Sequence, residues 1–285
     1  MTDQVPVLRY AAFAAEAGGG NPAGIVLDAS RLTDAQMQAI AAEVGYAETA
    51  FVVGRDLGDA RRLRLRYFSP GAEVPFCGHA TIATAVVLAT QAGAGPFHFD
   101  TPVGPIVIST ERHPDGVVAS FTSVEPRLAE LYPDVAHQLL SLVGLSPADL
   151  DARYPLRVSF AGNWHPVVMV RDRARFDEFS FDPQKMRALM DAEGWQGTVT
   201  VGYAIGATEF EVRNLFPVGT LTEDPATGSA AASLGGYLRS IGAVDAPVEI
   251  QIHQGAHVGR PSLLRASIPA DGGITVSGNA VEITE

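Results

Sequence analysis

Two short segments carry most of the side chains that could do chemistry. One is FCGHA, residues 76–80, which runs into TIATAVVLAT; the other is DPATGS, residues 224–229, which runs into AAASLGGYL. Each leads into a helix that is apolar on nearly every face, and such a helix must be enclosed by other elements. The first turn of a helix presents unpaired N–H groups and a positive dipole end, which attract anions. We therefore expect the chemistry at these two helix starts.

Glu48 is the candidate acid/base. It lies in YAETAFVV, where Tyr46 and Phe51 belong to small or apolar surroundings that would raise the pKa of a carboxyl group toward the range that proton transfer needs. The second half has no acidic counterpart after Gly194, where the chain reads WQGTVTV. Packing residues should recur in both halves, whereas catalytic residues need appear once. The alternative is a solvent-facing glutamate on a strand.

His79 and Cys77 accompany the first helix start. His79 stands where the second segment has Ser229. Its imidazole is suited to hydrogen-bonding a substrate or shuttling a proton, and the helix dipole would lower its pKa; a histidine bonded to a loop carbonyl is the alternative. Cys77 is a candidate thiolate nucleophile. Because it is the single cysteine of the chain, a two-thiol racemase cannot form, and buried packing is favoured.

The second helix start offers a carboxylate and anion-binding donors. Asp224 either rigidifies the Asp-Pro turn or acts as a second carboxylate that faces Glu48 across a cleft between two lobes. Ser229, with the N–H groups of Gly228 and Ala230, could hold an oxyanion or a carboxylate. A serine that caps a helix would look the same.

Other polar residues give weaker signals. Arg260, in HQGAHVGRPS, is a candidate cation for a substrate carboxylate, with an exposed loop as the alternative. His253 and His257 have the spacing of a metal-binding pair on a helix, but Gly255 interrupts them and the flanking residues alternate as in strands. We therefore expect no metal there.

Composition excludes several classes of function. The chain has 285 residues, is 47% hydrophobic and carries a formal net charge of −12. Without a basic run, binding to nucleic acid or to an anionic membrane is not expected. The N-terminus lacks a signal-type apolar core and no stretch free of turn formers is long enough to span a membrane, which predicts a cytoplasmic protein.

The chain repeats its own pattern. Thr33 and Gln36 form a capping box for a helix over 34–44 that Gly45 ends, and Asp182-Pro183 starts a helix that Gly194 ends. We match Pro22 with Pro166, Gly45 with Gly194, Arg66 with Arg213, Pro70 with Pro217, and residues 78–80 with 228–230. The nearly constant separation predicts two lobes, residues 1–120 and 121–285, with the last strand free to return to the first lobe.

These residues resemble one known family. GNPAGIVL, AETAF, YFSPGAEVPFCGHATIATA, DPATGSAAASLGGYL and QGAHVGRPS resemble the phenazine-biosynthesis isomerase-like (PhzF-like) family, which is related to the diaminopimelate epimerases. The resemblance implies an α+β fold of two similar lobes, each a curved, mostly antiparallel sheet or barrel around a buried helix. It also implies an active site in the cleft, no cofactor or metal, commonly a homodimer, and Glu48 as principal acid/base.

The resulting hypothesis is a cofactor-independent isomerase that moves a proton on a small carboxylated substrate. Its catalytic residues are Glu48, His79 and Asp224, and its substrate-binding residues are Gly78, Gly228, Ser229 and Arg260. In the related epimerases two cysteines exchange the proton, but here the second lobe offers Asp224 and Pro225. A thiol-type racemase using Cys77 and a non-catalytic binding member of the same fold are the alternatives.

Overall fold

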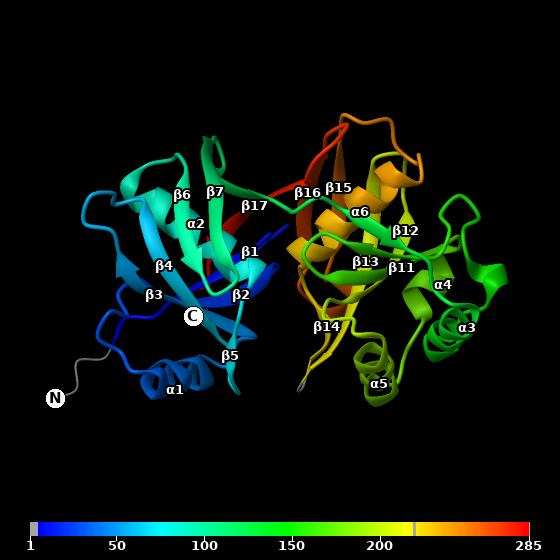
Figure 1. Cartoon of the computed structure of the whole chain (residues 1–285), viewed down its shortest axis with the longest axis horizontal. Helices are drawn as coiled ribbons and strands as arrows, with labels where there is room; N and C mark the ends of the chain where they lie inside the picture. Colours follow the sequence, from blue (N-terminus) through cyan, green and yellow to red (C-terminus); the bar gives the residue numbers. More distant parts are fainter. Residues whose placement is uncertain (1–4, 219–220, 285) are drawn as a thin grey trace. The chain divides into compact units, whose positions relative to one another are not determined.

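The chain divides into two compact units. The computed structural model describes residues 5–218 and 221–284. Unit 1 runs to Phe121 and includes the chain from Ser277 onward, and unit 2 is Thr122–Val276. Each unit wraps strands around one buried helix (Figure 1).

Unit 1 is a closed barrel. Its strands are β1 (Leu8–Ala12), β2 (Asn21–Val26), β3 (Glu48–Arg55), β4 (Arg62–Phe68), β5 (Glu73–Val74), β6 (Phe97–Thr101), β7 (Gly104–His113), β8 (Gly116–Thr122) and β17 (Thr275–Glu282). Pairing runs β1-β2-β3-β4-β6-β7-β8-β17 and returns to β1, while β5 pairs with β4. The β2–β3 and β4–β6 pairs are parallel. Closure gives each strand of this ring a paired neighbour on both sides.

The helix inside unit 1 is α2 (Gly78–Ala92). Its residues from His79 to Ala89 are all buried, and it packs against β1, β2, β3 and β7. This confirms that a helix without a polar face is enclosed. The other helix, α1 (Asp34–Val44), lies outside the strands with Met37 and Ala41 against them, and it has the expected capping box and a left-handed Gly45 with φ 72° (Figure 1).

Unit 2 curls a sheet around α6 (Gly228–Ser240). Its strands are β9 (Arg127–Ala129), β10 (Arg157–Phe160), β11 (Trp164–Val170), β12 (Val199–Ala204), β13 (Glu209–Val218), β14 (Leu221–Asp224), β15 (Val248–Gln254) and β16 (Ser262–Ile268). Pairing follows β9-β10-β11-β12-β13-β15-β16, with β14 on β13. Gly236 lets α6 approach closely, because a Cβ there would lie 2.3 Å from that of Pro126.

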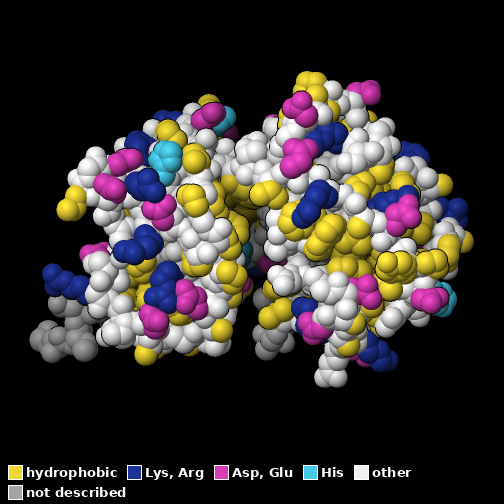
Figure 2. All heavy atoms as spheres, viewed as in Figure 1, with side chains coloured by type: hydrophobic (Ala, Val, Ile, Leu, Met, Phe, Trp, Pro, Cys, Tyr) yellow, Lys and Arg dark blue, Asp and Glu magenta, His cyan; other side chains and the backbone are white. Residues whose placement is uncertain are grey.

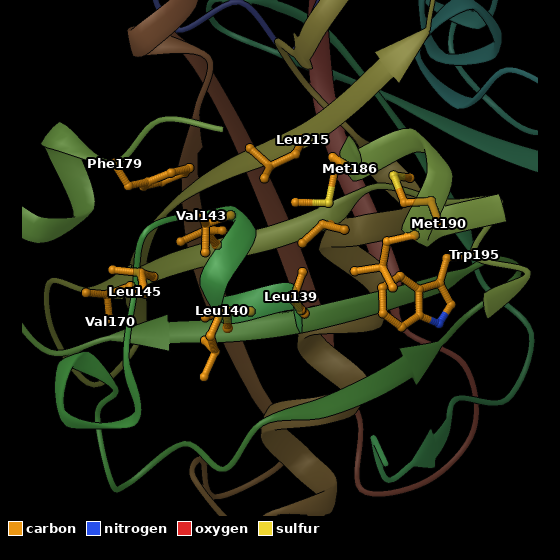
Figure 3. Packing of buried hydrophobic residues seen from close by; sticks show 14 of the residues in the cluster. Leu139, Leu140, Val143, Leu145, Val170, Phe179, Met186, Met190, Trp195 and Leu215 are labelled. Carbon is orange, nitrogen blue, oxygen red and sulfur yellow. The ribbon is translucent and has the colours of Figure 1, made fainter. Parts of the chain in front are cut away.

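The outer helices of unit 2 cover a second core. They are α3 (Pro133–Leu142), α4 (Arg173–Glu178) and α5 (Pro183–Glu193), with 3₁₀ turns at Pro147–Asp149 and Ala256–Val258. Figure 3 shows Met190 of α5 close to Trp195, in a cluster that also contains Met186 of α5 and Leu139 and Leu140 of α3. Asp182 caps α5 and a left-handed Gly194 ends it, as predicted.

The two units repeat one pairing pattern. The parallel pairs β2–β3 and β4–β6 of unit 1 correspond to β11–β12 and β13–β15 of unit 2. Ile25, Ala50 and Tyr67 lie opposite one another on β2, β3 and β4. Val167, Thr200 and Asn214 do so on β11, β12 and β13. Matching these two rows of residues also matches Arg66 with Arg213, as the sequence predicted. The predicted α+β fold of two similar lobes is thereby confirmed.

The same rows correct one detail of the predicted repeat. Counting back along β2 and β11 from the matched row, Pro22 corresponds to Trp164, so the match with Pro166 is wrong by two residues. Counting back along β3 and β12, Glu48 corresponds to Thr198. Strand register decides which side chains occupy the same face of a sheet, whereas the presence of a proline in both halves does not.

Charges of both signs are interspersed over the face drawn in Figure 2. Among residues 5–218 and 221–284, no helix has the length and apolar character needed to cross a membrane.

Candidate active site

Three reactive side chains of unit 1 meet at the start of α2. Glu48 is the first residue of β3, Cys77 is the N-cap of α2 and His79 lies in its first turn. The Cys77 Sγ lies 3.5 Å from the Glu48 Oε2 and 3.4 Å from the His79 Nδ1. The His79 Nε2 is 3.5 Å from the same carboxylate oxygen. The carboxylate, the thiol and the imidazole are therefore held together.

Burial controls the charge of His79. Loss of hydration lowers its pKa to about 4, partly offset by a hydrogen bond to the Pro22 carbonyl. The direction agrees with the sequence prediction, but the cause is burial and not the helix dipole. At neutral pH the ring is neutral, so it can offer Glu48 and a ligand a hydrogen-bonding group without a fixed charge.

Cys77 is buried, in agreement with the packing interpretation, but its thiol also contacts both neighbouring reactive groups. Its backbone is fixed in turn. The Thr81 hydroxyl donates to the Cys77 carbonyl oxygen at 2.6 Å and is hydrogen-bonded to the buried Tyr67 hydroxyl at 2.7 Å. The first turn of α2, including Gly78, is thus tied to β4.

The Asp224 loop of unit 2 is braced by hydrogen bonds. The Thr227 hydroxyl donates to the Asp224 carboxylate at 2.5 Å. The buried Gln254 side chain donates to the Asp224 carbonyl at 2.6 Å and accepts from the Thr227 N–H at 3.2 Å. The turn-rigidifying role of Asp224 is therefore observed. Gln254 carries no signal in the sequence, because its partners lie 27 and 30 residues away along the chain.

Ser229 is paired with a histidine that the sequence analysis did not single out. The Ser229 Oγ lies 3.1 Å from the Nε2 of His165. The Nδ1 of His165 lies 3.0 Å from the Thr198 N–H nitrogen, and burial lowers the pKa of His165 to about 4. A neutral ring therefore fixes the Ser229 hydroxyl at the start of α6, beside Gly228.

Arg260 packs next to the Asp224 loop. Gly255, with φ 82°, separates the two segments, and a Cβ there would lie 2.3 Å from the Arg260 carbonyl oxygen and 2.5 Å from that of Pro225. Only glycine fits this approach. Arg260 is half-buried, so the exposed-loop alternative does not describe it.

His253 and His257 do not form a metal-binding pair. His253 contacts Glu209 at 2.9 Å and His257 contacts Asp177 at 3.1 Å. Each has a carboxylate partner of its own. In the described ranges, the residues grouped closely enough to hold a metal ion are Glu48, Cys77 and His79, whose ligand atoms lie within 4.8 Å of one another.

The candidate residues thus form two groups with different chemistry. Unit 1 supplies Glu48, Cys77 and His79, which can accept, hold or donate a proton, and Gly78, whose backbone N–H lies in the first turn of α2. Unit 2 supplies a braced loop with Asp224, Gly228, Ser229 and Arg260, which offers hydrogen-bond donors and a cation.

Solved structures agree with this fold class. A hydroxyproline epimerase from Agrobacterium vitis matches with a TM-score of 0.61 at 10% identity, over 98% of this chain and 90% of that one. A phenazine biosynthesis protein of the PhzF family from Bacillus anthracis matches with a TM-score of 0.82 at 26% identity, over 98% and 96%. The first likeness shows the fold alone.

Sequence comparison shows the family. The family described as phenazine biosynthesis-like protein matches residues 10–285, and the chain belongs to it. The trans-2,3-dihydro-3-hydroxyanthranilate isomerase of Pseudomonas chlororaphis is 33% identical over 277 residues, covering 95% of this chain and 94% of that protein. An uncharacterised isomerase of Mesorhizobium japonicum is 32% identical over 299 residues, covering 98% and 96%. The protein is an isomerase.

Proposed function

We propose that this isomerase moves a proton on a small carboxylated substrate without a cofactor, and that Glu48 is the group that moves it. The supporting observation is the contact of the Glu48 carboxylate with the buried Cys77 thiol and His79 ring. Rigid elements hold this carboxylate near groups that can share a proton with it. Preorganisation of this kind raises the rate of general acid–base steps.

The proposed reaction is a balanced proton relocation. The Glu48 carboxylate removes a proton from a substrate carbon, which leaves a delocalised carbanion and a neutral carboxylic acid. The acid then returns the proton to another carbon, so no electron acceptor and no water is consumed. The N–H groups of Gly78 and Gly228 stabilise the negative charge of the intermediate, and neutral His79 and Asp224 accept hydrogen bonds from the substrate.

In the same proposal, the remaining residues bind the substrate carboxylate. The N–H groups of Gly78 and Gly228 belong to first helical turns, where they are not used by the helix itself. Ser229 donates its hydroxyl, and Arg260 supplies a positive charge. The working form that we propose is a cytoplasmic homodimer, which light scattering of the purified protein would test.

The first substrate to test is trans-2,3-dihydro-3-hydroxyanthranilate, because a relative is named for its isomerisation. In deuterated water, the enzyme should introduce solvent deuterium into the compound while it isomerises. Glu48→Gln keeps the shape of the side chain and removes the base. Its exchange rate should fall by about 10²–10⁴-fold.

A matched control is Glu43→Gln, which makes the same replacement at an exposed position of α1. It should leave exchange unchanged, and both variants should melt at the temperature of the parent. Equal exchange in the parent and in Glu48→Gln would reject the assignment of the base.

A thiol-based proton transfer is the second candidate, and the 3.5 Å contact of the Cys77 Sγ with Glu48 favours it. Cys77→Ala removes the thiol and little volume. If Glu48 is the base, this variant should keep most of its exchange activity. A loss as large as that of Glu48→Gln would assign the proton to the sulfur.

A further inference from the structure

We infer that Glu48, Cys77 and His79 form a binding site for a thiophilic divalent metal ion, with zinc as the ion that fits, and that metal bound there inhibits the enzyme. The binding step stands on geometry alone. The inhibition rests on the proposed function, because it follows from the role given to Glu48.

The three ligand atoms have the spacing of a zinc coordination shell. Sγ of Cys77 lies 3.7 Å from the His79 Nε2 and 3.5 Å from the Glu48 Oε2, and Nε2 lies 3.5 Å from Oε2. With zinc bonds of about 2.3 Å to sulfur and about 2.0–2.1 Å to nitrogen and oxygen, a tetrahedral site has ligand separations of about 3.3–3.6 Å. The three measured separations therefore differ from those of a zinc coordination shell by a few tenths of an ångström.

The chemistry of the donors selects the kind of metal. A thiolate and an imidazole favour zinc and similar borderline or soft ions, whereas magnesium and calcium prefer shells made of oxygen. Three protein ligands leave the fourth tetrahedral position for water or a substrate atom.

The surroundings resemble the support that metal ligands need. The His79 ring donates a hydrogen bond to the Pro22 carbonyl, an interaction that fixes the ring and leaves its other nitrogen as an acceptor. Cys77 and His79 are held on the first turn of α2, which Thr81 ties to Tyr67. The site is thus preorganised on a helix and a strand.

Occupancy by a metal would block the proposed chemistry. A carboxylate oxygen of Glu48 that binds zinc no longer accepts a proton from carbon. The same ion removes the lone pair of His79 that would serve a substrate. Zinc should therefore act as an inhibitor that a chelator reverses.

Cobalt(II) is the spectroscopic probe. A cobalt ion bound to a thiolate absorbs in the near ultraviolet through sulfur-to-metal charge transfer. Since Cys77 is the single cysteine of the chain, such a band can arise only from this site. We expect the band on titration of the whole protein with cobalt, and we expect added zinc to abolish it.

Variants locate the site without reference to activity. Cys77→Ser should lose the charge-transfer band, and Glu48→Gln and His79→Gln should each weaken zinc binding by about 10-fold or more, since even supporting residues are worth about 10–100-fold. His253→Ala is the control, because it removes a half-buried histidine–carboxylate pair elsewhere, and this variant should bind zinc as the parent does. Absence of the band in the parent, or equal zinc affinity in Cys77→Ala and the parent, would overturn the inference.

Activity then tests the second half of the inference. Zinc should stop deuterium exchange in the parent, and a chelator should restore it. Bound zinc that leaves exchange intact would overturn the inhibition. A protein that binds cobalt through Cys77 but shows no exchange even without metal would contradict the proposed function and leave the metal site standing.

Discussion

The starts of the two buried helices have the same backbone setting and different side chains. At the start of α2 stand Glu48, Cys77 and His79, which can all titrate or react. At the start of α6, the place of Glu48 is taken by Thr198, whose backbone contacts His165, and His165 holds Ser229. The two units share the arrangement of strands and helices but carry different polar side chains at these helix starts. In the proposed function, Glu48 of unit 1 moves the proton, and the residues at the start of α6 bind and orient the substrate.

The largest expected difference between the two helix starts is in the steady-state kinetics of their variants. Glu48→Gln should lower kcat by about 10²–10⁴-fold, because it removes the base. Ser229→Ala should instead raise KM by about 10- to 100-fold, the value of one hydrogen bond to a charged group. Steady-state rates with trans-2,3-dihydro-3-hydroxyanthranilate measure both. A fall in kcat for Ser229→Ala as large as that for Glu48→Gln would contradict the division of roles.

An ion pair that occurs in both halves gives the next largest effect. Arg213 and Glu223 are both buried, and Arg213 also donates to the carbonyls of Phe176 and Phe179. Arg213→Met leaves Glu223 buried without its cation, so the free energy of unfolding should fall by about 3–5 kcal/mol.

The corresponding pair of unit 1 is the control. Arg66 bonds Glu73 and Asp34, with side chains 25%, 37% and 75% exposed. Arg66→Met should cost no more than about 1 kcal/mol. Urea titration measures both variants. Equal losses would show that burial does not set the strength of the pair.

The buried histidine of unit 2 should make stability depend on pH. The pKa of His165 is about 4 in the folded protein and 6.5 in its unperturbed form, so the unfolded chain binds the extra proton between these values. Stability is therefore complete above pH 6.5 and declines as the pH falls toward 4, by roughly 3 kcal/mol for a shift of this size. Urea unfolding at pH 7 and pH 4.5 measures the decline.

His165→Gln tests the source of that decline. It keeps a polar side chain and removes the titrating ring, so the dependence on pH should become shallower than in the parent. An unchanged slope would assign the effect to other groups.

The smallest effect concerns the residue beside Thr198. A Cβ at Gly197 would lie 2.5 Å from the His165 Cε1, whereas the positions of unit 1 that correspond to Gly197 and His165 are Ala47 and Ala23. Gly197→Ala should lower the free energy of unfolding by about 1–3 kcal/mol through overpacking. Gly206→Ala, at an exposed position with nothing within 4 Å, should be neutral. Thermal unfolding of the two variants measures the difference.

Local sequence patterns predicted much of the fold. Thr33 with Gln36 and Gly45 defined α1, and Asp182 with Gly194 defined α5, because caps are satisfied by residues only a few positions apart. The apolar runs after residues 78 and 228 predicted enclosed helices for the same local reason. The catalytic assignments of Glu48, His79 and Asp224 remain predictions that the kinetic variants test.

Residues that act through distant partners were not predicted. His165 lies within an apolar strand, and only the fold brings it to Ser229, 64 residues later. In the sequence, Gln254 resembles any other strand residue. In the structure, its side chain donates a hydrogen bond to the Asp224 carbonyl oxygen. A single polar residue in a strand gives no periodic signal, so sequence patterns cannot separate it from its neighbours.

By itself, the sequence determined where α1 and α5 begin and end, that two other helices are enclosed, and that reactive groups stand at the first turns of these two. These properties depend on residues next to one another along the chain. Only the tertiary structure decided that the Glu48 carboxylate meets the Cys77 thiol, 29 residues later, and that Thr198 is its counterpart in the other half. Strand register sets such contacts, and register is fixed by pairing between segments that are distant in the sequence.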